Sequence, residues 1–136
     1  MKESPAIKIL KNKRLSTTRF RIQLIELLLQ HDRTVSFREI NHVFADADRI
    51  TIYRNLKKLS LKGVIHSTVF NQEEYYALCS HQCCENEHIH DHVHFKCMKC
   101  NEVSCVDLLQ KINVQLHAHH IQSVHMNVQG ICQHCL

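Results

Sequence analysis

The chain has 136 residues and a formal net charge of +4, with eight cysteines and thirteen histidines. This length allows one compact domain or two very small ones, which excludes a large apolar core in either half. No apolar run approaches the ~20 residues of a membrane helix, and the N-terminus, Met-Lys-Glu-Ser-Pro, has no apolar stretch of the secretory kind. We therefore expect a cytoplasmic protein whose cysteines bind metal, with disulfides the less favoured alternative.

Charge and metal-ligating residues divide the chain into two unlike halves. Residues 1–72 carry 14 Lys and Arg against 6 Asp and Glu, and they contain no cysteine. Residues 73–136 carry 3 against 7, and they hold all eight cysteines and ten of the histidines. A basic half followed by a metal-rich half indicates a polyanion-binding region joined to a metal-binding module.

The first half predicts three short helices. Residues 16–30 have apolar side chains at helical spacing, with the first residue a candidate N-cap. Ser36 and Glu39 fit a capping box that opens a second helix. Asp48 can cap a third helix over residues 49–62. Three short helices with tight connections in a basic segment predict a helix-turn-helix core.

The next segment predicts a β-hairpin, which would be the wing of a winged helix. Two runs rich in β-branched and aromatic residues flank the polar tetrad 71–74. With that tetrad as the loop, Phe70 pairs with Tyr75. His66 then lies directly across from Cys79, with Cβ atoms about 5 Å apart on one face of the hairpin. A cross-strand pair of two metal-ligand residue types points to a metal site.

The second half predicts a small mixed domain. Residues 92–96 and 102–106 read as short strands on either side of a cysteine pair. Residues 108–119 predict a helix, and residues 121–128 predict a last strand. The apolar face of the predicted helix consists of Leu109, Ile112 and Leu116.

Two Cys-x-x-Cys pairs predict a structural zinc site. Their sulfurs belong to Cys97, Cys100, Cys132 and Cys135. Two such pairs can present four thiolates tetrahedrally to one ion. A redox dithiol would normally stand beside a βαβ pattern, and the sequence has none. Zinc bound in this way contributes on the order of 10 kcal/mol to folding, so we expect the second half to unfold without metal.

A second metal site is predicted from histidines that precede the first cysteine pair. On a strand His92 and His94 point the same way, because side chains repeat every second residue. They face away from the cysteine pair, so they are available to another ion. The opposed His66 and Cys79 can reach the same region, as can Cys105. The other interpretation is an exposed histidine-rich segment with casual affinity for divalent ions.

The third predicted helix opens with residues suited to DNA. Residues at the start of a recognition helix reach base edges, and cations further along it meet phosphates. The candidates there are Arg49, Thr51, Tyr53, Arg54 and Lys57. A second basic patch is predicted at Arg14, Arg19 and Arg21. One basic helix alone would be read as a solvated face, but two patches together favour nucleic acid.

Four segments carry a resemblance to a known family. They are Leu15-Ser-Thr-Thr-Arg19, Thr51-Ile-Tyr-Arg54, His92-Val-His-Phe-Lys-Cys-Met-Lys-Cys100 and Gly130-Ile-Cys-Gln-His-Cys135. With them the chain resembles the ferric uptake regulator (Fur) family of bacterial metal-dependent repressors over essentially its whole length. The resemblance implies an α+β protein that is not an enzyme and that binds double-stranded operator DNA as a homodimer.

The same resemblance implies a division of the chain and roles for single residues. Residues 1–80 would form a winged-helix DNA-binding domain, residues 81–136 an α/β dimerisation domain, and residues 79–91 the hinge between them. The four cysteines of the two pairs match structural zinc ligands, and the two strand histidines match hinge-site ligands. Tyr53 and Arg54 match contacts to base and phosphate, and Arg14 matches a basic residue that enters the minor groove.

Departures from the family pattern favour its zinc-uptake (Zur) branch. Iron- and peroxide-sensing members usually have a carboxylate where this chain has Ala77, histidine where it has Thr34, and Asp or Glu where it has Cys105. The zinc-uptake branch resembles this chain in using a thiolate at the position of Cys79, with His or Asp near His66. Sulfur and nitrogen ligands suit zinc better than Fe²⁺ or Mn²⁺.

We therefore predict a transcriptional repressor that senses zinc and binds its operator as a metal-loaded homodimer. The predicted regulatory ligands are His66, Cys79, His92 and His94. Further candidate ligands are His90 and Cys105. Zinc would also be the structural ion, and Fe²⁺ or Mn²⁺ the alternative regulatory ion.

Three other functions stay open at this point. The first is iron or peroxide sensing by a regulator of the same family. The second is a DNA-binding protein switched by thiol oxidation, for which the candidates are Cys79, Cys83, Cys84 and Cys105. The third, a zinc-buffering or enzymatic module, leaves the basic half unexplained, and the sequence has no evident catalytic arrangement.

Overall fold

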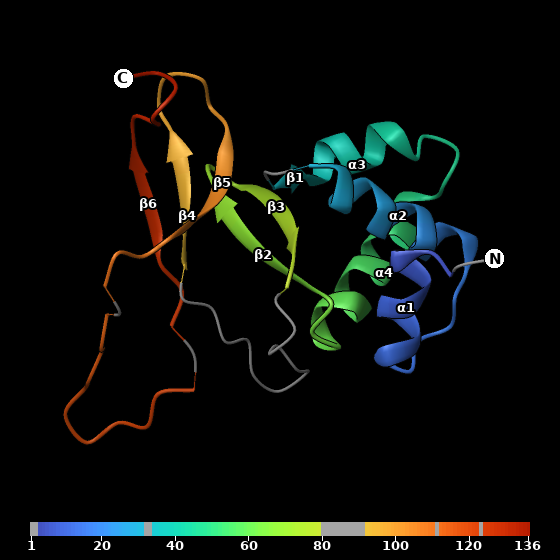
Figure 1. Ribbon diagram of the computed structural model, residues 1–136, viewed down its shortest axis with the longest axis horizontal. Coiled ribbons are helices and arrows are strands. Elements are labelled where there is room, and N and C mark those ends of the chain that lie inside the picture. Colours follow the sequence, from blue (N-terminus) through green and yellow to red (C-terminus); the bar gives the residue numbers. More distant parts are fainter. Residues whose placement is uncertain (1–2, 32–33, 80–91, 111, 123) are drawn as a thin grey trace.

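The computed structural model describes residues 3–31, 34–79, 92–110, 112–122 and 124–136. Two lobes lie side by side along the longest axis, with the N-terminus at one end and the C-terminus at the other (Figure 1). The N-terminal lobe combines four helices with a three-stranded sheet, and the C-terminal lobe is a second three-stranded sheet. Within the described residues, no helix is long and apolar enough to cross a membrane.

The four helices each begin behind a side chain that caps the first backbone N–H groups. They are α1 (Pro5–Asn12), α2 (Arg19–Gln30), α3 (Phe37–Val43) and α4 (Arg49–Leu61). The capping residues are Ser4, Thr18, Ser36 and Asp48. Such caps satisfy donors that a helix leaves without an internal partner. The predicted caps at Ser36 and Asp48 are confirmed, with Ser36 Oγ accepting the Glu39 backbone N–H, whereas the predicted cap at Ser16 is wrong.

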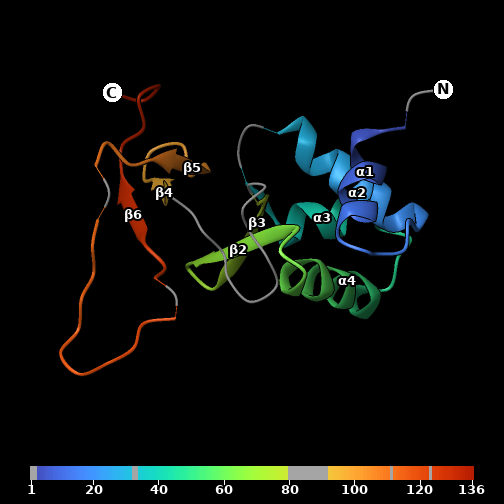
Figure 2. The same cartoon turned by 60° about the horizontal axis from the view of Figure 1, so that its bottom comes forward.

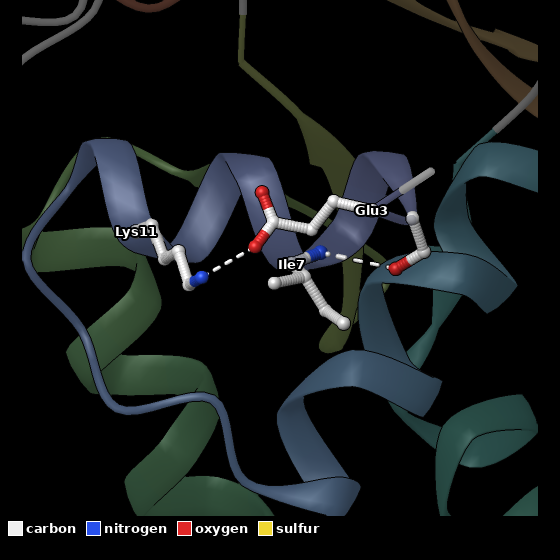
Figure 3. Close-up of polar contacts among 4 residues, drawn as sticks. Glu3, Ile7 and Lys11 are labelled. Atoms are coloured by element: carbon white, nitrogen blue, oxygen red, sulfur yellow. Dashed lines mark hydrogen bonds and ion pairs between the residues drawn. The ribbon is translucent and has the colours of Figure 1, made fainter. Parts of the chain in front are cut away.

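Helix α1 lies outside the predicted elements. Ser4 Oγ accepts a hydrogen bond from the Ile7 backbone N–H at 3.3 Å, and Pro5 occupies the first helical position (Figure 3). An ion pair between Glu3 and Lys11 runs along the exposed face (Figure 3). The opposite face buries Ala6 and Leu10 completely. The sequence holds signals for this helix, since Ser4 and Pro5 form a typical helix start and apolar residues follow at helical spacing.

The wing sheet consists of β1 (Val35–Ser36), β2 (Ile65–Phe70) and β3 (Glu73–Leu78), in the order β1-β3-β2. Phe70 pairs with Glu73, so the predicted four-residue loop is wrong. The turn has two residues, Asn71 and Gln72, with φ of 52° and 67°. Positive φ at both central residues is the signature of a type I′ hairpin turn, whose twist matches that of the strands.

The corrected register moves His66 opposite Ala77 instead of Cys79. Because the shift is two residues, Cys79 stays on the same face of the hairpin and becomes a diagonal neighbour of His66. The backbone N–H of Cys79, just beyond β3, donates to the Val64 carbonyl at 2.9 Å. The predicted proximity of the two side chains therefore survives the error in register.

The core of the N-terminal lobe lies between the helices and the wing sheet. Fourteen buried residues form one cluster, drawn from α1, α2, α3, α4 and the strands of the sheet. Its largest fully buried side chains include Leu10, Leu24, Ile25, Ile52 and Leu56. Helix α4 packs against β2 beside this core, so its outer face is left to solvent. This order of helices and strands is that of a winged helix.

The C-terminal sheet consists of β4 (His92–Cys97), β5 (Val103–Asp107) and β6 (Asn127–Gly130). Strand β4 lies in the middle, antiparallel to β5 and parallel to β6. The first two strands were predicted within one residue of their bounds. The predicted strand over residues 121–128 is largely wrong, because β6 begins at residue 127.

The predicted helix over residues 108–119 is wrong. In the described part of this segment there is no helix, and the chain makes a wide excursion between β5 and β6, orange in Figure 1. The side chains expected to face inward, Leu109, Ile112 and Leu116, are 104%, 56% and 57% exposed. An amphipathic helix of this length draws most of its stability from packing. In the single chain these three side chains are not packed against an apolar surface.

Polar contacts join the two lobes. The buried Thr34, next to β1, donates to the Val103 carbonyl through its backbone N–H at 3.2 Å and its hydroxyl at 2.8 Å. On the other side, Thr68 on β2 donates to Asn127 on β6 at 2.8 Å. In both views the wing sheet stands between the helices and the second sheet (Figures 1 and 2). A side chain on β2 can therefore meet side chains on β4 and β5.

Candidate metal centres

Four sulfur atoms gather at the end of the C-terminal lobe. The Sγ atoms of Cys97, Cys100, Cys132 and Cys135 all lie within 4.8 Å of one another. Cys97 ends β4, Cys100 follows in the turn before β5, and the other two stand in the turn after β6. Two turns that are some 35 residues apart in the chain thus present a set of donors that fits one tetrahedral zinc ion.

The surroundings of these sulfurs favour a bound cation. The Cys97 sulfur accepts backbone N–H bonds from Cys100, Cys132 and Lys99, each at 3.4 Å, and these lower the pKa of its thiol to about 6. The neighbouring Cys132 side chain and desolvation raise the pKa of Cys135 to about 12. Four crowded thiols cannot all lose their protons without a positive charge among them, and a divalent ion supplies that charge.

A second cluster lies where the wing meets the C-terminal sheet. Ligand atoms of His66, His94 and Cys105 all lie within 4.8 Å of one another. His66 comes from β2, His94 from β4 and Cys105 from β5. The two imidazole rings have centroids 4.9 Å apart, and His66 Nε2 lies 3.6 Å from the Cys105 sulfur. Both histidines are buried, so an ion bound there would be held inside the junction of the lobes.

The three residues meet because of strand pairing. His94 and Cys105 face each other as a cross-strand pair between β4 and β5. Partial burial and the carboxylate of Asp107 raise the pKa of the Cys105 thiol to about 11. Binding a metal there therefore has to displace a proton from the thiol. Cys105, predicted only as a further candidate, is thus the sulfur that the structure brings together with the two histidines.

The predicted ligand Cys79 lies on the other side of the His66 ring. Its sulfur is 3.5 Å from His66 Nδ1, whereas Cys105 is beside Nε2. The two nitrogens of one imidazole point in different directions and cannot both bind the same ion. Cys79 therefore stays a predicted ligand, and the geometry offers it a second role as the group that orients the ring.

Two further predicted ligands and two predicted redox cysteines lie wholly or partly outside the described residues. His92 belongs to β4, where its backbone pairs with Asp107. Its side chain lies outside the described part of the structure. His90, Cys83 and Cys84 fall between residues 79 and 92, outside the described ranges.

The predicted DNA contacts other than Arg21 are exposed. Arg49, at the start of α4, stacks its guanidinium over the Phe37 ring at 5.5 Å, and Tyr53 makes an edge contact with the same ring at a centroid distance of 6.5 Å. The other exposed candidates are Arg14, Arg19, Thr51, Arg54 and Lys57. The first turns of α4 and the loop before α2 thus present cations and polar groups to solvent.

Arg21 does not belong to this surface, so the prediction that placed it in the second basic patch is wrong. Its side chain is 9% exposed, and its guanidinium donates to Asn55 Oδ1 at 3.0 Å and to Ser16 Oγ at 2.8 Å. Arg21 ties α2 to α4 and to the loop before α2. Two arginines two residues apart on a helix point to different sides, which the sequence pattern of basic residues alone does not separate.

Comparison with known proteins identifies the chain's relatives. A sequence model of the ferric uptake regulator family matches residues 12–130, most of the chain. The chain belongs to this family. Proteins named ferric uptake regulation protein from Staphylococcus epidermidis and Staphylococcus aureus are 29% and 28% identical to it over 141 residues. These alignments cover 99% of this chain and 96% and 98% of the relatives.

Solved structures of the Fur family have the same fold. Holo XcZur matches with a TM-score of 0.66 at 20% identity, covering 96% of this chain and 97% of that one. A zinc uptake regulator complexed with zinc and DNA matches with a TM-score of 0.62 at 21% identity, covering 96% and 89%. The ferric uptake regulator of Vibrio cholerae matches with a TM-score of 0.60 at 23% identity, covering 92% and 98%.

Membership in the Fur family settles the general class of function. The chain is a metal-responsive, DNA-binding transcription regulator and not an enzyme. The predicted α+β fold is confirmed by the Fur structures. The relatives differ in the metal that their names carry, so the metal of this chain has to be argued from its own donor atoms.

Proposed function

We propose that this chain is a zinc-responsive repressor that binds operator DNA as a homodimer. A structural zinc ion would be held by the four cysteines of the C-terminal lobe. A regulatory zinc ion would be held by His66, His94 and Cys105 at the junction of the lobes. The observation that carries the proposal is the composition of this second cluster, which among the described residues has two nitrogen donors, one sulfur donor and no carboxylate.

Donor chemistry supports zinc over the harder ions. Thiolate and imidazole bind Zn²⁺ strongly, whereas Fe²⁺ and Mn²⁺ favour sites with carboxylate oxygens. The solved structures with this fold include a zinc uptake regulator complexed with zinc and DNA, and holo XcZur. The two staphylococcal relatives are named for ferric uptake, and this favours iron as the rival ion.

The regulatory mechanism follows from where the three donors stand. His66 moves with the wing, while His94 and Cys105 belong to the C-terminal sheet. When bound, the ion would supply a cross-link between these three strands and so favour one orientation of the two lobes. In a homodimer that orientation sets the spacing of two α4 helices, which must suit major grooves about 34 Å apart. A coupling of about 1–3 kcal/mol would account for such a response.

In this mechanism Cys79 orients the His66 ring and does not bind the ion. With His66 Nε2 and the Cys105 sulfur 3.6 Å apart, Nδ1 of the same ring remains beside Cys79. A partner on the second nitrogen fixes the tautomer and the orientation of a ligating histidine. In the rival arrangement Cys79 is itself the ligand, together with His66 Nδ1.

The test is a DNA-binding titration with the full chain already holding its structural zinc. The probe is a duplex selected from a random-sequence pool in the presence of zinc. We expect zinc to raise duplex affinity, and Fe²⁺ or Mn²⁺ at equal free concentration to have a smaller effect. His94→Ala and Cys105→Ser should abolish the zinc response, whereas the control His125→Ala, at an exposed histidine, should keep it.

Two outcomes would contradict the proposal. A zinc response that survives Cys105→Ser but not Cys79→Ser would assign the ligand role to Cys79. If Fe²⁺ raised duplex affinity and Zn²⁺ did not, iron would be the regulatory ion. Sedimentation of the protein with the duplex tests the homodimer, because two chains per operator are expected.

A further inference from the structure

The wing strand β2 meets the C-terminal sheet at two successive positions on one face. His66 and Thr68 are two residues apart on this strand, so their side chains point the same way. Both side chains are buried, each at 7% exposed. His66 enters the cluster with His94 and Cys105, and Thr68 meets Asn127 on β6. The candidate regulatory site therefore has an immediate polar neighbour at the same junction.

Asn127 uses both ends of its side chain on β2. Its Oδ1 atom accepts a hydrogen bond from the Thr68 hydroxyl at 2.8 Å. Its Nδ2 atom donates to the Val69 carbonyl at 3.2 Å. A carboxamide can donate and accept at once, so a single side chain makes two bonds to consecutive residues of the wing.

Asn127 is also tied to the metal-site histidine through the backbone. In the parallel pairing of β4 and β6, Asn127 is the register partner of His94. The His94 backbone N–H donates to the carbonyl of Met126, the residue just before Asn127, at 3.1 Å. The Asn127 side chain, which bonds to the wing, thus stands beside His94, which would bind the ion, on the neighbouring strand at the same level.

We propose that Thr68 and Asn127 form a latch that holds the wing against the C-terminal sheet without metal and thereby sets the affinity of the regulatory site. The proposal rests on the proposed function of the His66, His94 and Cys105 cluster. Asn127 acts here as a positioning residue, because it contacts the wing and not the ion. The latch matters because the three donors come from both lobes and bind an ion together only while the lobes are docked.

The size of the effect follows from the population of the docked state. When only a fraction of the molecules has the donors together, the apparent metal affinity falls in proportion to that fraction. Two hydrogen bonds of ordinary net strength change the equilibrium constant for docking by about tenfold or more. The contact between Thr34 and Val103 remains when the latch is cut, so we expect weakened metal binding and not separation of the lobes.

The experiment uses the full chain with its structural zinc in place. The affinity for a second equivalent of zinc is measured by competition with a chromophoric chelator. We expect Asn127→Ala and Thr68→Val to weaken it by about threefold to tenfold. The double variant should lose little more than Asn127→Ala alone, because that substitution already removes the bond that Thr68→Val breaks. The control Gln129→Ala, at an exposed residue of the same strand, should bind zinc like the parent protein.

Two further measurements separate a latch from general damage to the fold. At saturating zinc the latch variants should bind the selected duplex as tightly as the parent protein, because excess metal restores the docked state. With Co²⁺ in the second site, their thiolate-to-cobalt absorption band should match that of the parent, because the donors are unchanged. A shifted band, or weak duplex binding at saturating zinc, would overturn the positioning role.

His94→Ala distinguishes failure of the latch from failure of the regulatory site. If this variant loses the second equivalent while Asn127→Ala and Thr68→Val bind it with parental affinity, the latch is wrong and the site stands. If His94→Ala still takes up the second equivalent, the regulatory site itself is wrong, and the latch falls with it. Additive losses in the double variant would also overturn the latch.

Discussion

The two lobes are stabilised in different ways. The fourteen residues of the main core cluster all lie between Ala6 and Tyr76, in the N-terminal lobe. In the described part of the C-terminal lobe, the buried apolar residues are Val93, Cys97 and Val103. One lobe is held by packed aliphatic side chains, and the other has a small sheet whose cysteines can be joined by an ion.

This contrast explains the uneven distribution of cysteine along the chain. A lobe of about 45 residues cannot bury enough apolar surface to fold by packing alone, and small domains of this kind use metals or partner chains. The N-terminal lobe needs no such support, and residues 1–72 contain no cysteine. The junction between the lobes combines both designs, with two buried histidines beside the sulfur of Cys105.

The largest expected effect comes from removing the metal held by the four cysteines of the C-terminal lobe. Treatment with a strong chelator, or Cys132→Ser, should unfold residues 92–136, because metal binding contributes on the order of 10 kcal/mol there. Residues 3–79 should stay folded on their own core. Amide hydrogen exchange checks this, with protection lost in the C-terminal lobe alone. Simultaneous loss of protection in both lobes would mean that the lobes fold as one unit.

A substitution in the apolar core should destabilise the N-terminal lobe and leave zinc binding by the C-terminal lobe unchanged. Leu56 on α4 is 1% exposed, and Leu56→Ala should lower the free energy of unfolding of the N-terminal lobe by about 2–5 kcal/mol. Urea denaturation followed by circular dichroism measures the loss. Zinc bound by the four cysteines should remain at one equivalent. Lys57→Ala, at the exposed neighbouring position, is the control and should change stability by no more than ~0.5 kcal/mol.

Arg21 and Arg19 separate structure from DNA contact within the N-terminal lobe. Arg21→Met loses the bonds to Asn55 and Ser16 and should cost about 1–3 kcal/mol of stability. The salt dependence of DNA binding by the Arg21→Met variant should match that of the parent protein. Arg19→Ala should leave stability nearly unchanged and lower the slope of log affinity against log salt by about one. Equal slopes for both variants would contradict the assignment of Arg19 to the DNA surface.

The smallest expected effect concerns Gly63, which ends α4 with φ of 75°. A Cβ in the left-handed region is strained, so Gly63→Ala should lower the stability of the N-terminal lobe by about 1–2 kcal/mol. Gly63→Asn is the matched control and should cost less, because asparagine tolerates this conformation. Thermal unfolding at fixed zinc measures both. An equal loss of stability in the two variants would contradict the explanation by backbone strain at residue 63.

Local signals in the sequence predicted much of the N-terminal lobe. Caps at Ser36 and Asp48 and the glycine after α4 have local causes, so they could be found without knowledge of the fold. The hairpin was predicted, but its register was not, because the two-residue turn at Asn71 and Gln72 needs positive φ at non-glycine residues. Arg21 was misassigned, because burial of a charged side chain depends on distant partners such as Asn55.

The candidate sites show the same division between local and distant causes. The four-cysteine site was predictable because its spacing is a local motif repeated twice. The second site was predicted in part, since Cys105, which lies 3.6 Å from His66 Nε2 and opposite His94, was only a further candidate ligand. Cys105 enters because β5 pairs with β4, and Asn127 because β6 is parallel to β4. No sequence spacing encodes these pairings.

The family, the basic and metal-rich halves, the caps at Ser36 and Asp48 and the four-cysteine site could be recognised from the amino-acid sequence, because each depends on residues close together in the chain. The folded structure was needed for the register of the wing, the exposure of the segment after β5, and the meeting of His66, His94 and Cys105. The register depends on a turn with positive φ at two non-glycine residues, whereas the meeting of His66 with Cys105 joins residues 39 positions apart. Their geometry is set by packing, which no local pattern records.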